Sequence, residues 1–140
     1  MFLNDKFIEI CKTNNIQYNT SVTTNGYLLS SSIFEYLKNT PLTHLQITLD
    51  GPAKTHNVSR PLKNGDPTFD VILDNIKTAV NSGIKVLISV NVTKLNIDQI
   101  PELYQILEKQ GLKNRVQIIL KPVVSSLAHP CKNQCLSANV

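Results

Sequence analysis

The sequence predicts an α/β fold, a partial β/α barrel of about four parallel strands with covering helices. Segments rich in β-branched residues alternate with amphipathic helical segments in units of roughly 30 to 40 residues, which is typical of parallel strands joined by right-handed crossovers. The length of 140 residues is enough for one domain with a modest core. A complete β/α barrel needs about 200 residues or more, so we expect only an arc of one.

Local patterns place eight elements along the chain. They are helices over 5–14, from 30–32 onward, over 66–83 and over 98–110, and strands over 16–23, 44–49, 84–92 and 116–120. We expect Asn4 to cap the first helix, and Ser30, Ser31 or Ser32 to cap the second, where Ser32 with Glu35 fits a capping box. Asn25 and Gly26 end the first strand, because glycine tolerates the positive φ of a tight exit. A loop of about sixteen residues follows the second strand, and loops of that length are usually functional or mobile.

The strand that ends at Asp50 has two chemically different faces. Side chains alternate along a strand, so aliphatic residues point one way and four polar residues the other, namely His44, Gln46, Thr48 and Asp50. The outer face of a barrel strand packs on helices, so the polar set is expected to face the lumen as a ligand-binding wall. The alternative is that these four side chains hydrogen-bond to one another or to nearby backbone.

Composition narrows the classes of function. Hydrophobic residues make up 41% of the chain and charged residues 17%, which indicates a globular protein rather than a disordered one. The net charge of +4 is spread without a basic cluster interleaved with aromatics, so we expect no nucleic-acid partner. No apolar run approaches a membrane span and no leader pattern opens the chain, so we expect no membrane partner. Three cysteines, an odd number, fit a reducing, cytoplasmic compartment.

Several motifs together carry a resemblance to a known family, over roughly residues 16–122. They are His44-Leu45-Gln46-Ile47-Thr48-Leu49-Asp50-Gly51-Pro52 with His56, Arg60 and Asn64 to Asp70 behind it, Thr24-Asn25-Gly26-Tyr27-Leu28-Leu29 upstream, and Asn91-Val92-Thr93 with Pro101-Glu102-Leu103 downstream. In order and spacing they resemble radical SAM enzymes. The closer resemblance is to the branch with a C-terminal SPASM extension, which includes the anaerobic sulfatase-maturating enzymes.

One hallmark of that family is missing from the sequence. Its members hold a [4Fe–4S] cluster with three cysteines spaced C-x3-C-x2-C near the N-terminus, and no such triad precedes Thr24, since Cys11 stands alone. The Gly-Gly-Glu segment of the family is absent as well. We therefore expect the middle and later part of a catalytic barrel, unable by itself to bind the cluster and inactive as this chain. Formation of 5′-deoxyadenosine by this chain with iron, sulfide and a reductant would contradict that expectation.

The resemblance implies roles for individual residues. Thr48 stands where the family has a hydroxyl near the ribose or amino-acid part of S-adenosylmethionine, and Arg60 matches an arginine able to pair with the cofactor carboxylate. Asn91 occupies a position near the cofactor in this branch. Further candidates are Gln46 and Asn25 for cofactor binding and Asp50, at the catalytic end of its strand, for catalysis. Asp50 and Asn25 are also ordinary turn residues, Asn91 fits a structural strand end, and Arg60 fits a solvated loop.

Two cysteines near the end of the chain form a second motif. Cys131 and Cys135 are spaced C-x3-C, with Ala138 where a third cysteine would stand, so this pair alone cannot hold a radical SAM cluster. We divide the chain into a barrel part, 1–122, and a tail, 123–140. The tail either carries no metal or begins an auxiliary-cluster region, and apart from these weak candidates we expect no metal ligands. His56 is expected to shape its loop, because no partner ligand lies at metal-binding spacing.

The implied parent activity is the formation of a 5′-deoxyadenosyl radical from S-adenosylmethionine at a [4Fe–4S] cluster. That radical would modify a peptide or protein side chain, as in sulfatase maturation, and the protein would supply positioning and exclusion of water. One alternative is a non-catalytic binding or scaffold module. Another is an unrelated, aldolase-like barrel fragment that uses Asp50 with Lys121. Open sheet edges also predict self-association.

Overall fold

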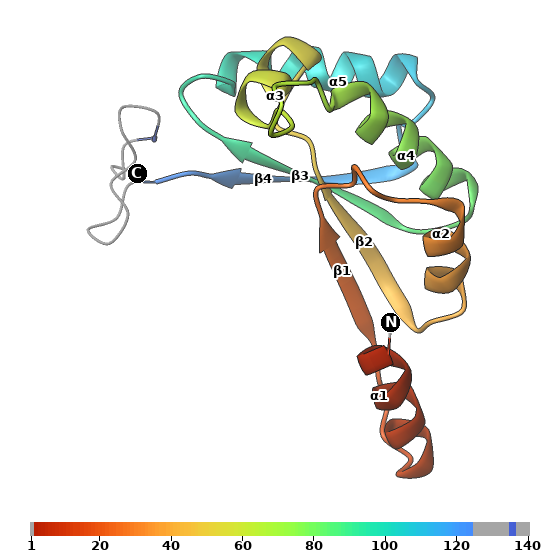
Figure 1. The fold of residues 1–140 in the computed structure, drawn as a ribbon. Coiled ribbons are helices and arrows are strands. Elements are labelled where there is room, and N and C mark those ends of the chain that lie inside the picture. The colour runs from red at the N-terminus through yellow and green to blue at the C-terminus, as the bar shows by residue number, and fades with distance from the viewer. Residues whose placement is uncertain (1, 125–134, 137–140) are drawn as a thin grey trace.

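The fold is a single four-stranded parallel sheet with helices on one side. A computed structural model describes residues 2–124 and 135–136, in which the strands are β1 (Thr20–Thr24), β2 (Leu42–Thr48), β3 (Val86–Val92) and β4 (Val116–Pro122), in spatial order β1-β2-β3-β4. All three neighbouring pairs are parallel. The sheet curves into an arc, as Figure 1 shows. The predicted fold, a partial β/α barrel of four parallel strands, is confirmed.

Helices connect the strands and cover one face of the sheet. They are α1 (Phe2–Thr13), α2 (Ser31–Lys38), α3 (Ala53–Ser59), α4 (Phe69–Asn81), the short 3₁₀ helix η1 (Ile97–Gln99) and α5 (Ile100–Lys109). Helices α2, α4 and α5 lie on the convex side of the arc, whereas α1 projects from its lower end (Figure 1). We call the opposite, uncovered side of the sheet the concave face.

The core lies between the sheet and the convex-side helices. The apolar set of β2 is completely buried and packs with the apolar faces of α4 and α5, in a cluster that includes Leu45, Ile47, Leu49, Ile72, Ile76, Ile88, Val90, Leu103 and Leu107. The alternate residues Gln46 and Thr48 are only half-buried, on the concave face. The parallel register sets Thr48 beside Ser89, so the polar side chains of neighbouring strands share that face. The predicted two-faced strand is confirmed.

Several predicted element boundaries are wrong, and long-range contacts explain them. The expected sixteen-residue loop contains α3, a seven-residue helix in which only His56 is buried. Helix α4 begins at Phe69 rather than at 66–67, because the side chain of Asn57 accepts the backbone N–H groups of Thr68 and Phe69 at 3.0 and 2.9 Å. A side chain from α3 therefore caps α4, which the sequence around residues 66–67 does not reveal.

The first two elements also differ from the prediction. Helix α1 begins at Phe2 and not after Asn4, whose side chain instead bonds to the hydroxyls of Tyr18 and Tyr36 at 2.8 and 3.0 Å. The first strand begins at Thr20 rather than at residue 16, because the N–H of Ile16 still donates to Cys11 O at the end of α1. At α2 the cap is Ser30, whose Oγ accepts the N–H of Ile33.

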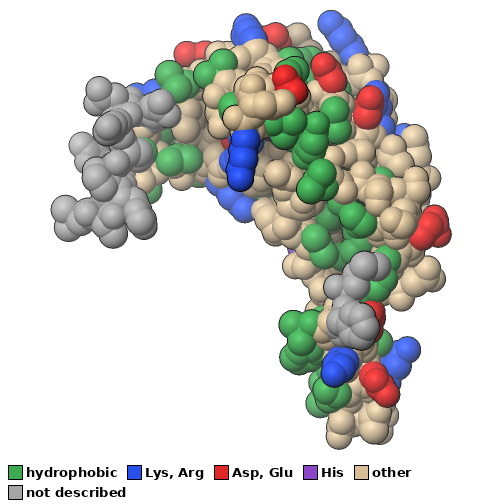
Figure 2. All heavy atoms as spheres, viewed as in Figure 1, with side chains coloured by type: hydrophobic (Ala, Val, Ile, Leu, Met, Phe, Trp, Pro, Cys, Tyr) green, Lys and Arg blue, Asp and Glu red, His purple; other side chains and the backbone are tan. Residues whose placement is uncertain are grey.

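Strand β4 is the least covered part of the sheet. Ile118 and Leu120 point to the convex side, yet they are 39% and 48% exposed because no helix in the described residues packs over them. Beyond β4, Leu136 forms an isolated parallel bridge with Val124, and its N–H donates to Val123 O at 2.9 Å. Figure 2 shows charged side chains of both signs scattered over the visible face, and hydrophobic ones both across the middle of that face and at its lower end, where α1 lies. Across the described ranges, no helix has the length and apolarity to cross a membrane.

Gly26 gives a direct test of the packing between β1 and the core. Its φ is +80°, and a Cβ there would stand 2.6 Å from Cγ2 of the buried Ile47. We expect Gly26→Ala to lower the free energy of unfolding by about 2–5 kcal/mol, from left-handed strain plus overpacking. Gly83→Ala is the matched control, since Gly83 has nearly the same φ, +82°, with nothing within 4 Å of the added Cβ. The control should lose only about 1–2 kcal/mol. If urea unfolding gives the same loss of unfolding free energy for both variants, a clash between the new Cβ and Ile47 is contradicted.

Candidate functional site

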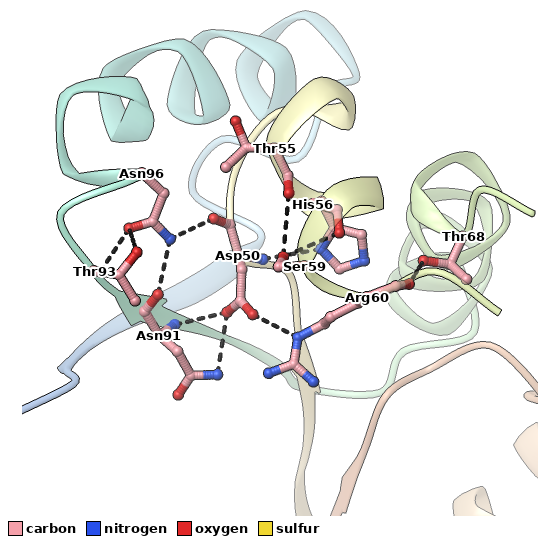
Figure 3. A network of polar contacts seen from close by, with 9 residues as sticks. All are labelled: Asp50, Thr55, His56, Ser59, Arg60, Thr68, Asn91, Thr93 and Asn96. Atoms are coloured by element: carbon pink, nitrogen blue, oxygen red, sulfur yellow. Dashed lines mark hydrogen bonds and ion pairs between the residues drawn. The ribbon is translucent and has the colours of Figure 1, made fainter. Parts of the chain in front are cut away.

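The carboxylate of Asp50 is the centre of a hydrogen-bond network at the carboxyl ends of β2 and β3. Its side chain is only 7% exposed. Oδ1 accepts the backbone N–H of Asn91 at 2.8 Å and the side-chain Nδ2 of Asn91 at 3.1 Å, and Oδ2 accepts Nε of Arg60 at 2.5 Å. Figure 3 shows the Arg60 guanidinium and the Asn91 amide on either side of this carboxylate. The charge of Asp50 is thus matched by a cation and two N–H donors, as a buried ion requires.

Asn96 locks the two strand ends together. Its side chain lies in the loop after β3 and the residue is 3% exposed. Nδ2 donates to the backbone O of Asp50 at 2.7 Å and to that of Asn91 at 2.8 Å, while Oδ1 accepts the N–H of Thr93 at 2.7 Å. One buried amide therefore holds both residues whose side chains meet at the carboxylate.

His56 holds the backbone of Asp50 from the other side. The ring is fully buried, packs edge-on against Phe69 with centroids 5.9 Å apart, and its Nδ1 accepts the N–H of Asp50 at 3.1 Å. Nδ1 therefore carries no proton, and the neutral ring keeps its proton on Nε2, which has no partner among the described residues. Burial lowers the pKa of His56 to about 4, with Arg60 adding to the effect and Asp50 opposing it.

Arg60 is fixed along its backbone but keeps unused donors at its tip. Its N–H donates to His56 O at 2.8 Å, and its O accepts the Thr68 hydroxyl at 2.7 Å. Only Nε is engaged by Asp50, and no hydrogen bond from the described part of the chain reaches the two terminal nitrogens. The side chain is 37% exposed. Such a guanidinium can still bind a planar anion through two parallel hydrogen bonds.

The remaining predicted residues occupy different places. Gln46 and Thr48 lie on the concave face of β2, half-buried, and within the described residues their side chains carry no hydrogen bond. Asn25 is exposed at the end of β1, where its Oδ1 accepts the N–H of Tyr27 at 3.1 Å in a local turn. The structure therefore joins Asp50, Arg60 and Asn91 in one network and leaves Asn25 outside it.

Sequence reasoning missed two residues of this network, Asn96 and the buried role of His56. Thr93 and Asn96 form a short side-chain turn, since the Thr93 hydroxyl also accepts the N–H of Leu95. That Thr-x-x-Asn spacing was the available signal, but it does not reveal the two distant carbonyls that Asn96 binds. His56 does shape its loop, as expected. It does so through the hydrogen bond from the N–H of Asp50 to its Nδ1, which no local sequence pattern predicts.

The two cysteines that the structure describes, Cys11 and the disulfide-bonded Cys135, take no part in this network. Cys11 is buried on α1, Cys135 is buried beside the bridge to Val124, and Cys131 lies outside the described residues. In the parts of the chain that the structure describes, no three His, Cys, Asp or Glu side chains come together as a metal site.

The low pKa of His56 predicts a specific acid sensitivity. An unfolded histidine binds its proton near pH 6.5, whereas the folded one resists until about pH 4. The contribution of neutral His56 to the free energy of unfolding is therefore complete above pH 6.5. It falls by about 2–3 kcal/mol as the pH drops toward 4. In His56→Asn, Oδ1 can replace Nδ1 as the acceptor but does not titrate, so this part of the pH dependence should vanish. Urea unfolding between pH 4 and 7.5 measures both proteins, and identical slopes would refute the assignment.

Comparisons with known proteins agree with this architecture. A model of the Radical SAM superfamily matches residues 2–107. The Fe-coproporphyrin III synthase of Methanosarcina barkeri (strain Fusaro / DSM 804) is 29% identical over 91 residues, which are 65% of this chain and 22% of that protein.

Solved structures with the same fold include two of anSMEcpe and one of SuiB. The structure of anSMEcpe with bound AdoMet has a TM-score of 0.72 at 21% identity, over 90% of this chain and 34% of that one. The structure of anSMEcpe with AdoMet and the Cp18Cys peptide also has a TM-score of 0.72 at 21% identity. That match covers 90% of this chain and 36% of that one. The structure of SuiB of Streptococcus suis bound to S-adenosylmethionine has a TM-score of 0.56 at 20% identity. That match covers 91% of this chain and 28% of that one.

The chain thus spans between 22% and 36% of the length of these proteins. At such low identity the solved structures show a shared fold and no more. The superfamily model, however, matches well over half of the chain, and the match runs through β1, β2, β3 and most of α5. On that evidence, this protein belongs to the radical SAM superfamily.

Proposed function

We propose that this chain forms part of the S-adenosylmethionine-binding wall of a radical SAM enzyme that modifies a peptide or protein side chain. The observation that carries the proposal is the pair formed by Arg60 and Asn91, held on either side of the Asp50 carboxylate at the carboxyl ends of β2 and β3. Active sites of β/α barrels are assembled at that end of the strands. Membership of the superfamily removes the unrelated, aldolase-like alternative.

The chemistry of these residues fits the methionine part of S-adenosylmethionine. The unused terminal nitrogens of Arg60 match a carboxylate, and because Asn91 spends its Nδ2 on Asp50, its Oδ1 is left to accept from an ammonium group. Thr48 offers a hydroxyl on the same concave face. When bound beside a [4Fe–4S] cluster, S-adenosylmethionine supplies a 5′-deoxyadenosyl radical for hydrogen abstraction. This chain's residues would bind and orient the cofactor and exclude water from it.

The cluster itself does not fit the described residues. Three thiolates are needed, and the structure describes only two cysteines, Cys11 as a free thiol on α1 and Cys135 as a disulfide-bonded one. We derive no step through the cluster from this chain. The catalytic role predicted for Asp50 stays a prediction. Its contacts favour a positioning role, because both carboxylate oxygens already accept donors from Arg60 and Asn91.

The finer parts of the proposal rest on the comparisons. A peptide substrate is supported by the fold shared with anSMEcpe, which has been solved with the Cp18Cys peptide. We extend the proposal to the SPASM branch, to a sulfatase-maturase-like reaction and to a cytoplasmic location. Within it, the boundary at residue 122 and an auxiliary-cluster role for Cys131 and Cys135 remain predictions. A scaffold module is the alternative outcome if S-adenosylmethionine does not bind.

Arg60 tests the cofactor proposal. Arg60→Lys keeps a cation for Asp50 but loses the planar fork, so we expect S-adenosylmethionine to bind about tenfold more weakly or worse. Arg115→Lys is the control, since Arg115 donates to Asn81 at the opposite end of the sheet. Isothermal titration or NMR titration of the 140-residue chain measures both affinities. The proposal fails if the parent chain does not bind at millimolar cofactor, or if Arg60→Lys binds as tightly as the parent.

Strand β4 tests the predicted self-association. Its free edge and the exposed Ile118 and Leu120 favour pairing with a second copy. We expect a dimer whose population rises with concentration in light scattering, and Ile118→Lys should shift it toward monomer. Val71→Lys, on α4, is matched in exposure at 41% against 39% and should have no effect. A monodisperse monomer over a wide concentration range would count against this prediction.

A further inference from the structure

A cleft of about 610 Å³ opens beside the Asp50 network. Helix α3 forms one wall through Lys54, Val58 and neighbouring residues, and the segment from Thr93 to Gln99 forms the other. Asp50 and Asn91 also line it, so the cleft is continuous with the candidate cofactor site. Its volume lies within the range of about 300–1,000 Å³ that is usual for ligand pockets.

Most polar side chains along the two walls of the cleft already have partners, either across the cleft or in the backbone. Thr55 donates its hydroxyl to Oε1 of Gln99, which joins the two walls. Ser59 donates its hydroxyl to the backbone of α3 at 3.1–3.2 Å, and Asn96 spends both side-chain atoms on backbone groups. An occupant therefore finds few free partners for hydrogen bonds along these walls.

What the cleft does offer is apolar surface without net charge. Val58 and Leu95 stand on the two walls and are 80% and 56% exposed. Lys54 pairs with Glu102 at 3.2 Å, and Asp50 is compensated by Arg60. A charged group would find no counter-ion that is not already paired, whereas an apolar group gains by removing these two side chains from water.

We propose that this cleft is a specificity subsite for an apolar side chain of the peptide substrate. The inference rests on the proposed peptide-modifying function. It adds that the peptide residue seated between Val58 and Leu95 is hydrophobic and close in sequence to the modified residue. The continuity through Asp50 and Asn91 is the reason, because an occupant of the cleft lies beside the residues proposed to hold S-adenosylmethionine.

The test uses the 140-residue chain and three blocked peptides, Gly-Gly-X-Gly-Gly with X as Leu, Asp or Gly. In methyl NMR titrations we expect the Leu peptide to shift Val58 and Leu95, with at least tenfold weaker binding of the Asp and Gly peptides. Leu95→Asp should weaken the Leu peptide about tenfold. Ile16→Asp is the matched control, since Ile16 is also 56% exposed but lies before β1, away from the cleft. Both positions are exposed, so neither variant should unfold the chain.

Several outcomes would overturn the subsite. They are equal binding of the Leu and Gly peptides, shifts confined to other residues, or undiminished affinity in Leu95→Asp. Methyl shifts of Val58 and Leu95 that depend on protein concentration alone would mean that a second copy fills the cleft, which also refutes it. The test needs no S-adenosylmethionine. Peptide binding without cofactor binding would therefore keep the subsite and reject the cofactor proposal, and the reverse would do the opposite.

Discussion

The structure depends on the compensation of one buried carboxylate. Asp50 sits where β2 ends, and an ion with so little access to water is tolerated only with partners in place. Those partners come from the loop behind α3 and from the end of β3, so Arg60 and Asn91 are drawn together by the same charge. His56 and Asn96 hold the backbone of Asp50 from two sides. Two stretches of the chain that are distant in sequence, residues 50–60 and 91–96, thus share one arrangement, and loss of any partner would disturb the others.

The sequence was most informative where one local rule was enough. Alternation in β2 identified the concave face correctly, since Ile47 must be buried and Thr48 must then point the other way. The sequence identifies Asp50, Arg60 and Asn91 as separate candidates. It does not show that their side chains contact one another, because that contact requires the parallel register of β2 and β3. Helix α3 was missed for a related reason. Seven residues are too few to show a period, and the helix is held mainly by tertiary contacts of His56 and Asn57.

The exposed surfaces follow from the partial nature of the barrel. Each strand needs a helix on its convex side, and β2 and β3 have them, whereas β4 leaves Ile118 and Leu120 open to water. The concave face carries hydroxyl and amide groups from β2 and β3, which water can solvate where no ligand is present. The match to the AdoMet-bound anSMEcpe structure covers 34% of that protein, so the arc corresponds to only part of that larger fold.

The bridge between Val124 and Leu136 continues the sheet past the end of β3. The N–H of Val123 donates to Val92 O, and Val123 O accepts the N–H of Leu136. Both groups of one strand residue point to the same side, so Leu136 lies on the side of β4 that β3 occupies. The other edge of β4 has no neighbouring strand among the described residues, and a strand added there from outside meets no steric stop along β4. Its register would therefore have to be selected by the fit of its side chains.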